Sequence, residues 1–242
     1  MKKVVITGVS RGIGLETAKK FLENNFQVLG ISRSATKASI KDKNFFPLDS
    51  NLSKSENIKD LCKVIVSKGE VDILINNAGF GHFAALENIS PEKIIEMINL
   101  NVTSHILMTK YLLPSLKKQS GHIFNISSRA GHHAYRFGTV YCASKFGLRG
   151  FSEALFDEVR NSKVRVSNIS PGPVDTPFWD KLDREPEDRN GTAVDARDVA
   201  QVIFDTYSNK TAVLSEVMIL PQFHAMRFKN ESFFCKKKNY KT

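Results

Sequence analysis

Several features that are scarce in this sequence narrow the class of protein. Its three cysteines, Cys62, Cys142 and Cys235, are odd in number and show neither a disulfide framework nor metal-ligand spacing. No apolar run approaches the ~20 residues that span a bilayer, and the opening stretch MKKVVITG lacks the apolar core of a signal peptide. We therefore expect reduced thiols, no metal site, no membrane span and a cytoplasmic location.

Linkers and repeats are also missing. No stretch rich in Gly, Pro or Ser divides the 242 residues, and no low-complexity block occurs. The hydrophobic share of 41% and the charged share of 25% are ordinary for a globular protein. We predict a single domain over 1–228, carrying a polar, aperiodic flap at about 176–194.

The net charge of +10 is concentrated at the two ends of the chain. Residues 1–50 hold nine Lys/Arg against four Asp/Glu, and residues 229–242 hold five against one. The tail KNESFFCKKKNYKT is predicted to be a mobile, solvated terminus, and a polybasic contact with an anionic membrane or nucleic acid is the alternative. No nucleic-acid partner is expected, because the basic excess lies on no recognisable motif.

Short β-branched or apolar runs alternate with amphipathic stretches almost throughout the chain. The predicted strands are KKVVITG, QVLGIS, NFFPLD, VDILINNAG, HIFNISS, VRVSNISPG and EVMILP. Helical spacing covers about 13–25, 53–68, 91–118, 141–162 and 195–209. Because parallel strands need crossover connections, the pattern predicts the α/β class: a doubly wound Rossmann domain whose seven-stranded, mostly parallel sheet has helices on both faces.

A glycine-rich turn follows the first strand. TGVSRGIG places Gly8, Gly12 and Gly14 before an amphipathic helix, where the backbone can approach a pyrophosphate. The spacing differs from the general G-x-G-x-x-G fingerprint, and a tight turn without a ligand is the alternative.

The end of the second strand discriminates between nicotinamide cofactors. An acid there would hold a free ribose 2′-hydroxyl, but the strand ends GISRS with Ser32 and Arg33, and Arg11 lies in the glycine turn. Guanidinium groups suit a phosphomonoester, which favours NADP(H) over NAD(H). The alternative is that both arginines are solvated surface residues.

A tyrosine and a lysine stand one helical turn apart in TVYCASKFG. Tyr141 and Lys145 share a helix face, and a nearby cation favours the phenolate, so the tyrosine is a candidate general acid or base. An ordinary surface pair is the alternative for this motif alone. Ser127 and Ser128 end a predicted strand thirteen or so residues earlier, at the sheet edge that also receives INNAG and ISPGPVDT.

The sequence resembles the short-chain dehydrogenase/reductase family through a series of motifs in order: TGVSRGIG, NNAG, Asn101 in NLNVTS, Ser128, YCASK and PGPVDT. Within that family it is most similar to small NADP-dependent carbonyl or hydroxy-acid reductases and to sepiapterin-reductase-like members. The resemblance implies hydride transfer between NADP(H) and a small carbonyl or alcohol substrate. It implies that Tyr141 is the acid/base, that Ser128 holds the substrate oxygen, that Lys145 lowers the pKa of Tyr141 and binds the nicotinamide ribose, and that Asn101 fixes a proton-relaying water. The implied cofactor contacts are Gly8, Ser10, Arg11, Gly12, Ile13, Gly14, Ser32, Arg33, Asp49, Asn77, Ala78, Gly79, Tyr141, Lys145, Pro171, Gly172, Val174 and Thr176.

Aromatic and polar residues that follow the strands are expected to line the substrate pocket. They are Phe80, His82, His132, Tyr135, Phe178 and Trp179. Arg129 and Arg136 are candidates either for pairing a substrate carboxylate or for solvated surface. The resemblance also implies a homodimer or homotetramer. A catalytically silent NADP(H) sensor on the same fold is the competing function.

Overall fold

The computed structural model describes residues 1–180, 182, 184–187, 191–223 and 226–229. Its central sheet has seven strands in the order β10-β6-β5-β4-β1-β2-β3, and every adjacent pair is parallel. The strands are β1 (Lys3–Thr7), β2 (Gln27–Ser32), β3 (Phe45–Asp49), β4 (Ile73–Asn76), β5 (His122–Ile126), β6 (Arg165–Pro171) and β10 (Glu216–Ile219). All seven predicted strands and the doubly wound class are confirmed.

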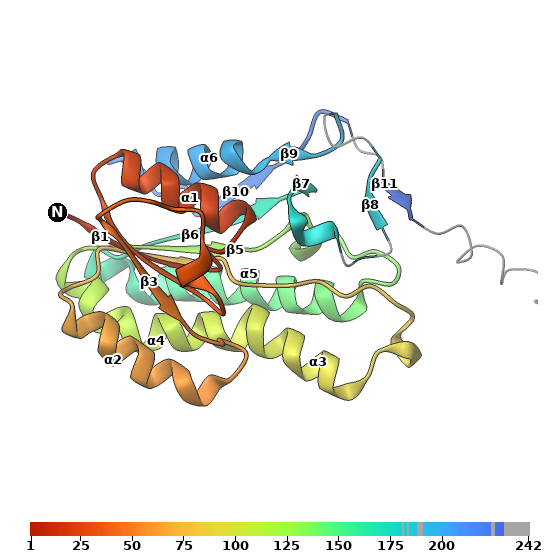
Figure 1. Cartoon of the computed structure of the whole chain (residues 1–242), viewed down its shortest axis with the longest axis horizontal. Coiled ribbons are helices and arrows are strands. Elements are labelled where there is room, and N and C mark those ends of the chain that lie inside the picture. The colour runs from red at the N-terminus through yellow and green to blue at the C-terminus, as the bar shows by residue number, and fades with distance from the viewer. Residues whose placement is uncertain (181, 183, 188–190, 224–225, 230–242) are drawn as a thin grey trace, which may run out of the picture.

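Helices cover both faces of the sheet (Figure 1). Figure 1 shows α1 (Gly12–Glu23) and α6 (Ala196–Ser208) on one side, and α2 (Ile58–Ser67), α4 (Ser104–Lys118) and α5 (Thr139–Val159) on the other. Two buried apolar clusters fill these layers, one around Phe21 and Phe124 and the other around Met108 and Leu112. Burial of both sheet faces explains why the strands consist of nearly continuous β-branched runs.

The helix predicted at 91–118 is interrupted. It consists of α3 (Pro91–Ile98), a π-helical turn η4 (Asn99–Thr103) and α4. The π turn adds a residue to the helical repeat and directs Asn101 into the protein interior. Ser90 caps the start of α3, its side chain accepting a hydrogen bond from the Lys93 amide. The short 3₁₀ helices are η1 (Ala35–Lys37), η2 (Ser55–Asn57), η3 (Leu86–Asn88), η5 (Arg129–Gly131), η6 (Arg160–Ser162) and η7 (Pro177–Trp179).

The flap contains more regular structure than its sequence indicates. Two short strands outside the main sheet, β7 (Val174–Asp175) and β9 (Val194–Asp195), pair in parallel across it. Its middle strand β8 (Arg184–Pro186) pairs antiparallel with β11 (Met226–Phe228), near the far end of the chain. Pairing of segments so distant in sequence leaves no local periodicity, which is why the flap resembles a loop.

The predicted mobile tail, 229–242, lies outside the described residues except for Lys229. That lysine is not free, because its ammonium donates to the Trp179 carbonyl oxygen at 2.6 Å and lies 3.7 Å from a Glu185 carboxylate oxygen. Cys62 and Cys142 are buried free thiols, and Cys235 lies outside the described residues. Within the described part of the chain, no helix is both long and apolar enough to cross a membrane.

Candidate active site

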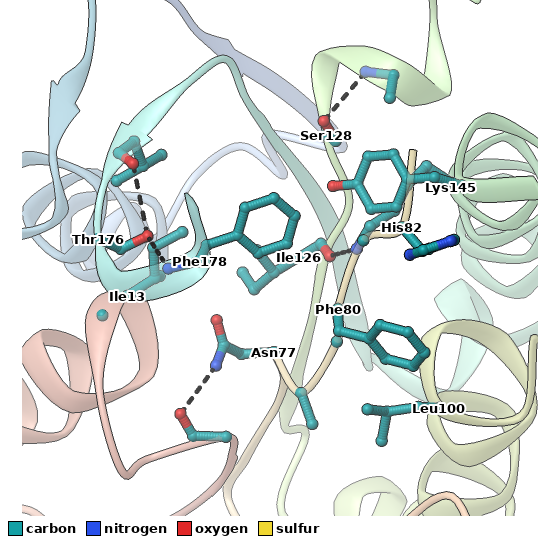
Figure 2. A pocket seen from close by; sticks show the side chains of 18 of the residues that line it. Ile13, Asn77, Phe80, His82, Leu100, Ile126, Ser128, Lys145, Thr176 and Phe178 are labelled. Atoms are coloured by element: carbon teal, nitrogen blue, oxygen red, sulfur yellow. Dashed lines mark hydrogen bonds between the residues drawn. The ribbon is translucent and has the colours of Figure 1, made fainter. Parts of the chain in front are cut away.

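A cleft of about 1130 Å³ opens along the carboxyl ends of the parallel strands. It lies where the chain order reverses across β1 and β4, the place where open α/β sheets bind ligands. Figure 2 shows Asn77, Ser128, Lys145 and Phe178 around one space, although they come from separate elements. The structure thus brings most of the predicted site residues together in a single cleft.

The glycine turn forms one end of the cleft. Gly8 and Gly12 have φ angles of +77° and +60°, and a Cβ at Gly8 would lie 2.6 Å from Asn77 Nδ2. Gly14 lies beneath the turn, because a Cβ there would lie 2.3 Å from the Gly8 carbonyl oxygen. Gly14 packs beneath the turn and does not line the cleft, and its predicted cofactor contact stays a prediction. The lining residues from this turn are Gly8, Ser10, Arg11, Gly12 and Ile13.

Both predicted phosphate-binding arginines line this end of the cleft. Arg33 follows β2, Arg11 precedes α1, and both side chains are exposed beside Ser32. Asp49 does not line the cleft. Its carboxylate accepts hydrogen bonds from the amide and hydroxyl of Thr36, at 2.9 and 2.8 Å, which hold its pKa below the usual value.

Five residues near Asp49 line the cleft although no cofactor contact was predicted for them. They are Ser34 after β2, and Ser50, Asn51, Leu52 and Ser53 after β3. The sequence could have indicated them, because they follow the predicted ends of β2 and β3, where open α/β sheets bind ligands. The side chain of Asp49, the last residue of β3, instead accepts hydrogen bonds from Thr36 of η1.

The NNAG turn is held by buried groups. The Thr7 hydroxyl accepts hydrogen bonds from the amides of Asn77 and Ala78, both at 2.9 Å, and Asn77 Nδ2 donates to the Thr7 carbonyl oxygen. His105 Nε2 lies 2.8 Å from the Ala78 carbonyl oxygen, and burial lowers the pKa of His105 to about 3. His105 is therefore neutral at physiological pH and donates this bond. Asn77, Ala78 and Gly79 line the cleft.

Asn76 bridges strands beneath this turn, as expected for a buried amide. Its Nδ2 donates to Asn125 Oδ1 at 2.9 Å and to Thr109 Oγ1 at 3.1 Å.

Ser128, Tyr141 and Lys145 meet above the end of β5. The Lys145 ammonium donates to the Ile126 carbonyl oxygen at 2.8 Å and lies 5.9 Å from the Tyr141 ring centroid. Ser128 Oγ accepts from the Ala130 amide at 3.1 Å and also interacts with the Tyr141 phenol. All three side chains line the cleft, which confirms that the chain brings them together.

Burial dominates the titration of this group. It raises the pKa of Tyr141 to about 12, against the opposing effect of Ser128, and it lowers the pKa of Lys145 to about 8. Burial is the largest influence on this phenol and Ser128 the opposing one, so the lowering of the Tyr141 pKa by Lys145 stays a prediction. Tyr141 holds its proton at neutral pH, as a proton donor requires.

Asn101 lies behind the cleft rather than on its wall. Its Oδ1 accepts from the Phe80 amide at 3.0 Å, while its Nδ2 donates to the Phe80 carbonyl oxygen at 2.9 Å and to Ser144 Oγ at 3.0 Å. The side chain therefore fastens the segment after β4 to α5. Its predicted water-relaying role is untested.

The end of β6 supplies another wall. Pro171, Gly172, Val174 and Thr176 line the cleft as predicted. The Thr176 hydroxyl accepts from the Phe178 amide at 3.3 Å and begins η7, which presents Phe178 and Trp179 to the opening. The cleft thus connects the glycine turn to the flap.

Aromatic rings surround the Tyr141 end of the cleft. Phe83 and Phe178 lie 5.3 and 6.1 Å from the Tyr141 ring, measured between ring centroids. The predicted pocket residues Phe80, His82, Tyr135, Phe178 and Trp179 all line this half, as do Leu182 and Met226, which were not predicted. Met226 reaches the cleft through the β8–β11 pairing, for which the sequence carries no local signal.

His132 does not line the pocket. Its Nε2 lies 3.1 Å from Ser170 Oγ and 3.2 Å from Glu216 Oε1, on the side facing the sheet edge. His132 therefore lies off the cleft wall, and its predicted substrate contact stays a prediction that this position does not support.

Comparison with known proteins agrees with this geometry. The family model for short chain dehydrogenases matches residues 2–187, more than half of the chain. The chain belongs to the short-chain dehydrogenase/reductase family. Sepiapterin reductase of Chlorobaculum tepidum is 30% identical over 233 residues, covering 90% of this chain and 94% of that protein. The 3-oxoacyl-(acyl-carrier-protein) reductase of Chlamydia muridarum is 36% identical over 186 residues, covering 72% of this chain and 75% of that protein.

Solved structures of the same family superpose on nearly the whole chain. An alcohol dehydrogenase from Thermococcus sibiricus complexed with 5-hydroxy-NADP has a TM-score of 0.83 at 25% identity, covering 93% of this chain and 98% of that one. A 3-ketoacyl-(acyl-carrier-protein) reductase from Brucella melitensis complexed with NADH has a TM-score of 0.80 at 25% identity, covering 90% of this chain and 96% of that one. As a member of this short-chain dehydrogenase/reductase family, the protein is an oxidoreductase of CH–OH and C=O groups.

Proposed function

We propose that the protein transfers a hydride between NADP(H) and a small carbonyl or alcohol substrate. The observation that carries the proposal is the convergence of Ser128, Tyr141 and Lys145 on a cleft whose other end is a glycine turn flanked by Arg11 and Arg33. The positive φ angles and close approach at Gly8 and Gly12 fit a nucleotide pyrophosphate, and the cleft has room for a dinucleotide and a small substrate. Bound there, the nicotinamide would supply the hydride.

The chain's own residues handle the oxygen and its proton. Ser128 donates a hydrogen bond to the carbonyl oxygen, and Tyr141 gives that oxygen its phenolic proton as negative charge develops there. Lys145, fixed by the Ile126 carbonyl oxygen, holds a positive charge beside the phenol and stabilises its anion. Asn101 positions Phe80 and Ser144 around this centre. In the oxidative direction, the same groups remove a proton from an alcohol.

The preference for NADP(H) is supported by the two arginines beside Ser32, with no carboxylate at the end of β2. Replacing Arg33→Ala should raise the Kd for NADPH about tenfold and leave that for NADH within about twofold, since one charge-assisted bond to the 2′-phosphate is lost. The control is Lys37→Ala, which removes a nearby positive charge outside the cleft wall. An equal effect of Arg33→Ala on both cofactors would refute the preference.

A silent NADP(H) sensor is the competing function. NADPH oxidation with any carbonyl compound of a broad panel, run in parallel with NADH, eliminates it. The cytoplasmic location and a homo-oligomeric assembly remain predictions.

A further inference from the structure

The half of the cleft nearest Tyr141 contains a cation that pairs with no acidic group among the described residues. Arg129, which directly follows Ser128, lines the cleft and is half-buried. Within the described parts of the chain, its guanidinium forms neither an ion pair nor a hydrogen bond. A partly desolvated guanidinium without a partner has lost hydration that it has not replaced, and a ligand anion would restore the balance.

The other lysines and arginines that line the cleft either have partners or lie at its opposite end. The Lys93 ammonium lies 2.7 Å from a Glu96 carboxylate oxygen, and the Lys145 ammonium donates to the Ile126 carbonyl oxygen. Arg11 and Arg33 belong to the end formed by the glycine turn. Arg129 is therefore the cation that remains available beside Ser128.

Acidic groups are scarce on the same surface. Among the described residues that line the cleft, Glu96 is the sole carboxylate, and Lys93 neutralises it. The remainder of this half consists of aromatic and apolar walls, including Phe83, Phe178 and Trp179. Low local polarity strengthens the attraction of a guanidinium for an anion, and the planar fork of arginine suits a carboxylate.

We propose that the substrate is an oxo acid, or the matching hydroxy acid, whose carboxylate pairs with Arg129 while its carbonyl oxygen faces Ser128 and Tyr141. This inference rests on the proposed function, and it specifies the substrate class of that site. The order of residues supports it, because Arg129 and Ser128 are neighbours on one turn: η5 begins at Arg129, and Ser128 caps it by accepting a hydrogen bond from the Ala130 amide. Two adjacent side chains thereby fix the carbonyl group relative to the carboxylate. The carboxylate is unchanged by the reaction and serves only to orient the substrate.

The first test compares matched substrates. The substrates are the 2-, 3- and 4-oxo acids of one short carbon skeleton and the methyl ester of each. NADPH oxidation is measured with the wild type, Arg129→Gln, Arg129→Lys and Arg160→Gln. Arg160 is a control for net charge, because it caps the far end of α5 and pairs with Asp157. For the preferred acid, Arg129→Gln should lower kcat/KM about 10- to 100-fold, mainly through KM, and leave the ester within about twofold. Arg129→Lys should recover part of the loss, and Arg160→Gln should match the wild type.

The second test measures binding without turnover. Trp179 is the single tryptophan of the chain and lines the cleft, so its fluorescence reports occupancy. With NADP⁺ present, phenylacetate should bind the wild type at least about tenfold more tightly than the neutral phenylacetamide, and Arg129→Gln should abolish the difference. Equal binding of the two probes, or a preference that survives in Arg129→Gln, overturns the inference.

The two tests separate this inference from the proposed function. An Arg129-dependent preference for phenylacetate without turnover of any oxo acid or ester supports the anion site and contradicts the carbonyl reductase. Turnover of acids and esters that is equally insensitive to Arg129 supports the reductase and overturns the oxo-acid substrate.

Discussion

At the scale of single residues, the site depends on two buried groups whose pKa values move in opposite directions. Burial raises the pKa of Tyr141 to about 12 and lowers that of Lys145 to about 8. The Tyr141 phenol therefore keeps its proton through the physiological pH range. The Lys145 ammonium beside it loses its proton above about pH 8. In the proposed reaction, the charge of Lys145 rather than the titration of Tyr141 should therefore limit proton donation at alkaline pH.

This opposition predicts the pH dependence of carbonyl reduction. Because a charged Lys145 stabilises the phenolate left by proton transfer, kcat/KM should be constant below about pH 8 and fall about tenfold per pH unit above it. The measurement is a pH profile of NADPH oxidation between pH 6 and 10. A profile that stays flat to pH 10 would contradict the role given to Lys145.

At the scale of elements, the flap is fastened by the strand β11. Glu185 on β8 lies 2.7 Å from the guanidinium of Arg227 on β11 and is mostly buried, with its side chain 14% exposed. Lys229 adds a hydrogen bond to the Trp179 carbonyl oxygen. Since Trp179, Leu182 and Met226 line the cleft, this pairing shapes the substrate half of the site.

Weakening the contact between β8 and β11 should reduce substrate binding and leave the rate of the chemical step unchanged. Glu185→Gln is expected to raise the substrate KM about two- to fivefold and to leave kcat within about twofold, as expected from losing an ion pair worth ~1 kcal/mol or less. Steady-state kinetics of Glu185→Gln, Arg227→Gln and the double variant measure the coupling. The control is Lys63→Gln, which removes an exposed pair with Asp60 on α2. An unchanged KM in both single variants would show that β11 does not shape the site.

The same elements show how far the sequence could be interpreted. Alternation of β-branched runs and amphipathic stretches predicted the sheet, because each repeats its pattern within a few residues. The meeting of Ser128, Tyr141 and Lys145 was predictable because they lie in short motifs, just after the end of β5 and at the start of α5. The partner of β8 and the cleft position of Met226 were not predictable, since they depend on pairing across 42 residues. Asp49 and His132 lie off the cleft wall because Thr36 and Glu216, 13 and 84 residues away, bind their side chains, and no local pattern marks such contacts.

At the scale of the whole molecule, one sheet supports both ends of the cleft. The glycine turn follows β1, and the cluster of Ser128, Tyr141 and Lys145 lies beyond the end of β5, with β4 between the two strands. Buried apolar clusters pack against both faces of this sheet, and the single domain over 1–228 stays a prediction. A ligand that spans the cleft should therefore stabilise the entire fold.

Thermal unfolding tests this coupling. We expect one cooperative transition, with NADPH at 100 times its Kd adding about 2.7 kcal/mol to the free energy of unfolding. If the proposed preference for NADP(H) holds, NADH at the same concentration should raise the Tm by less, because it would bind more weakly. Two separate transitions, or equal shifts from both cofactors, would contradict the single domain or the cofactor preference, respectively.

The most direct test of the account compares the wild type with Tyr141→Phe in NADPH oxidation, with the Kd for NADPH measured on both proteins. The account predicts that kcat falls about 10²- to 10⁴-fold with the oxo-acid and ester panel, while the Kd for NADPH stays within about twofold. A Tyr141→Phe variant that retains wild-type kcat would contradict proton transfer by Tyr141, and with it the proposed reaction.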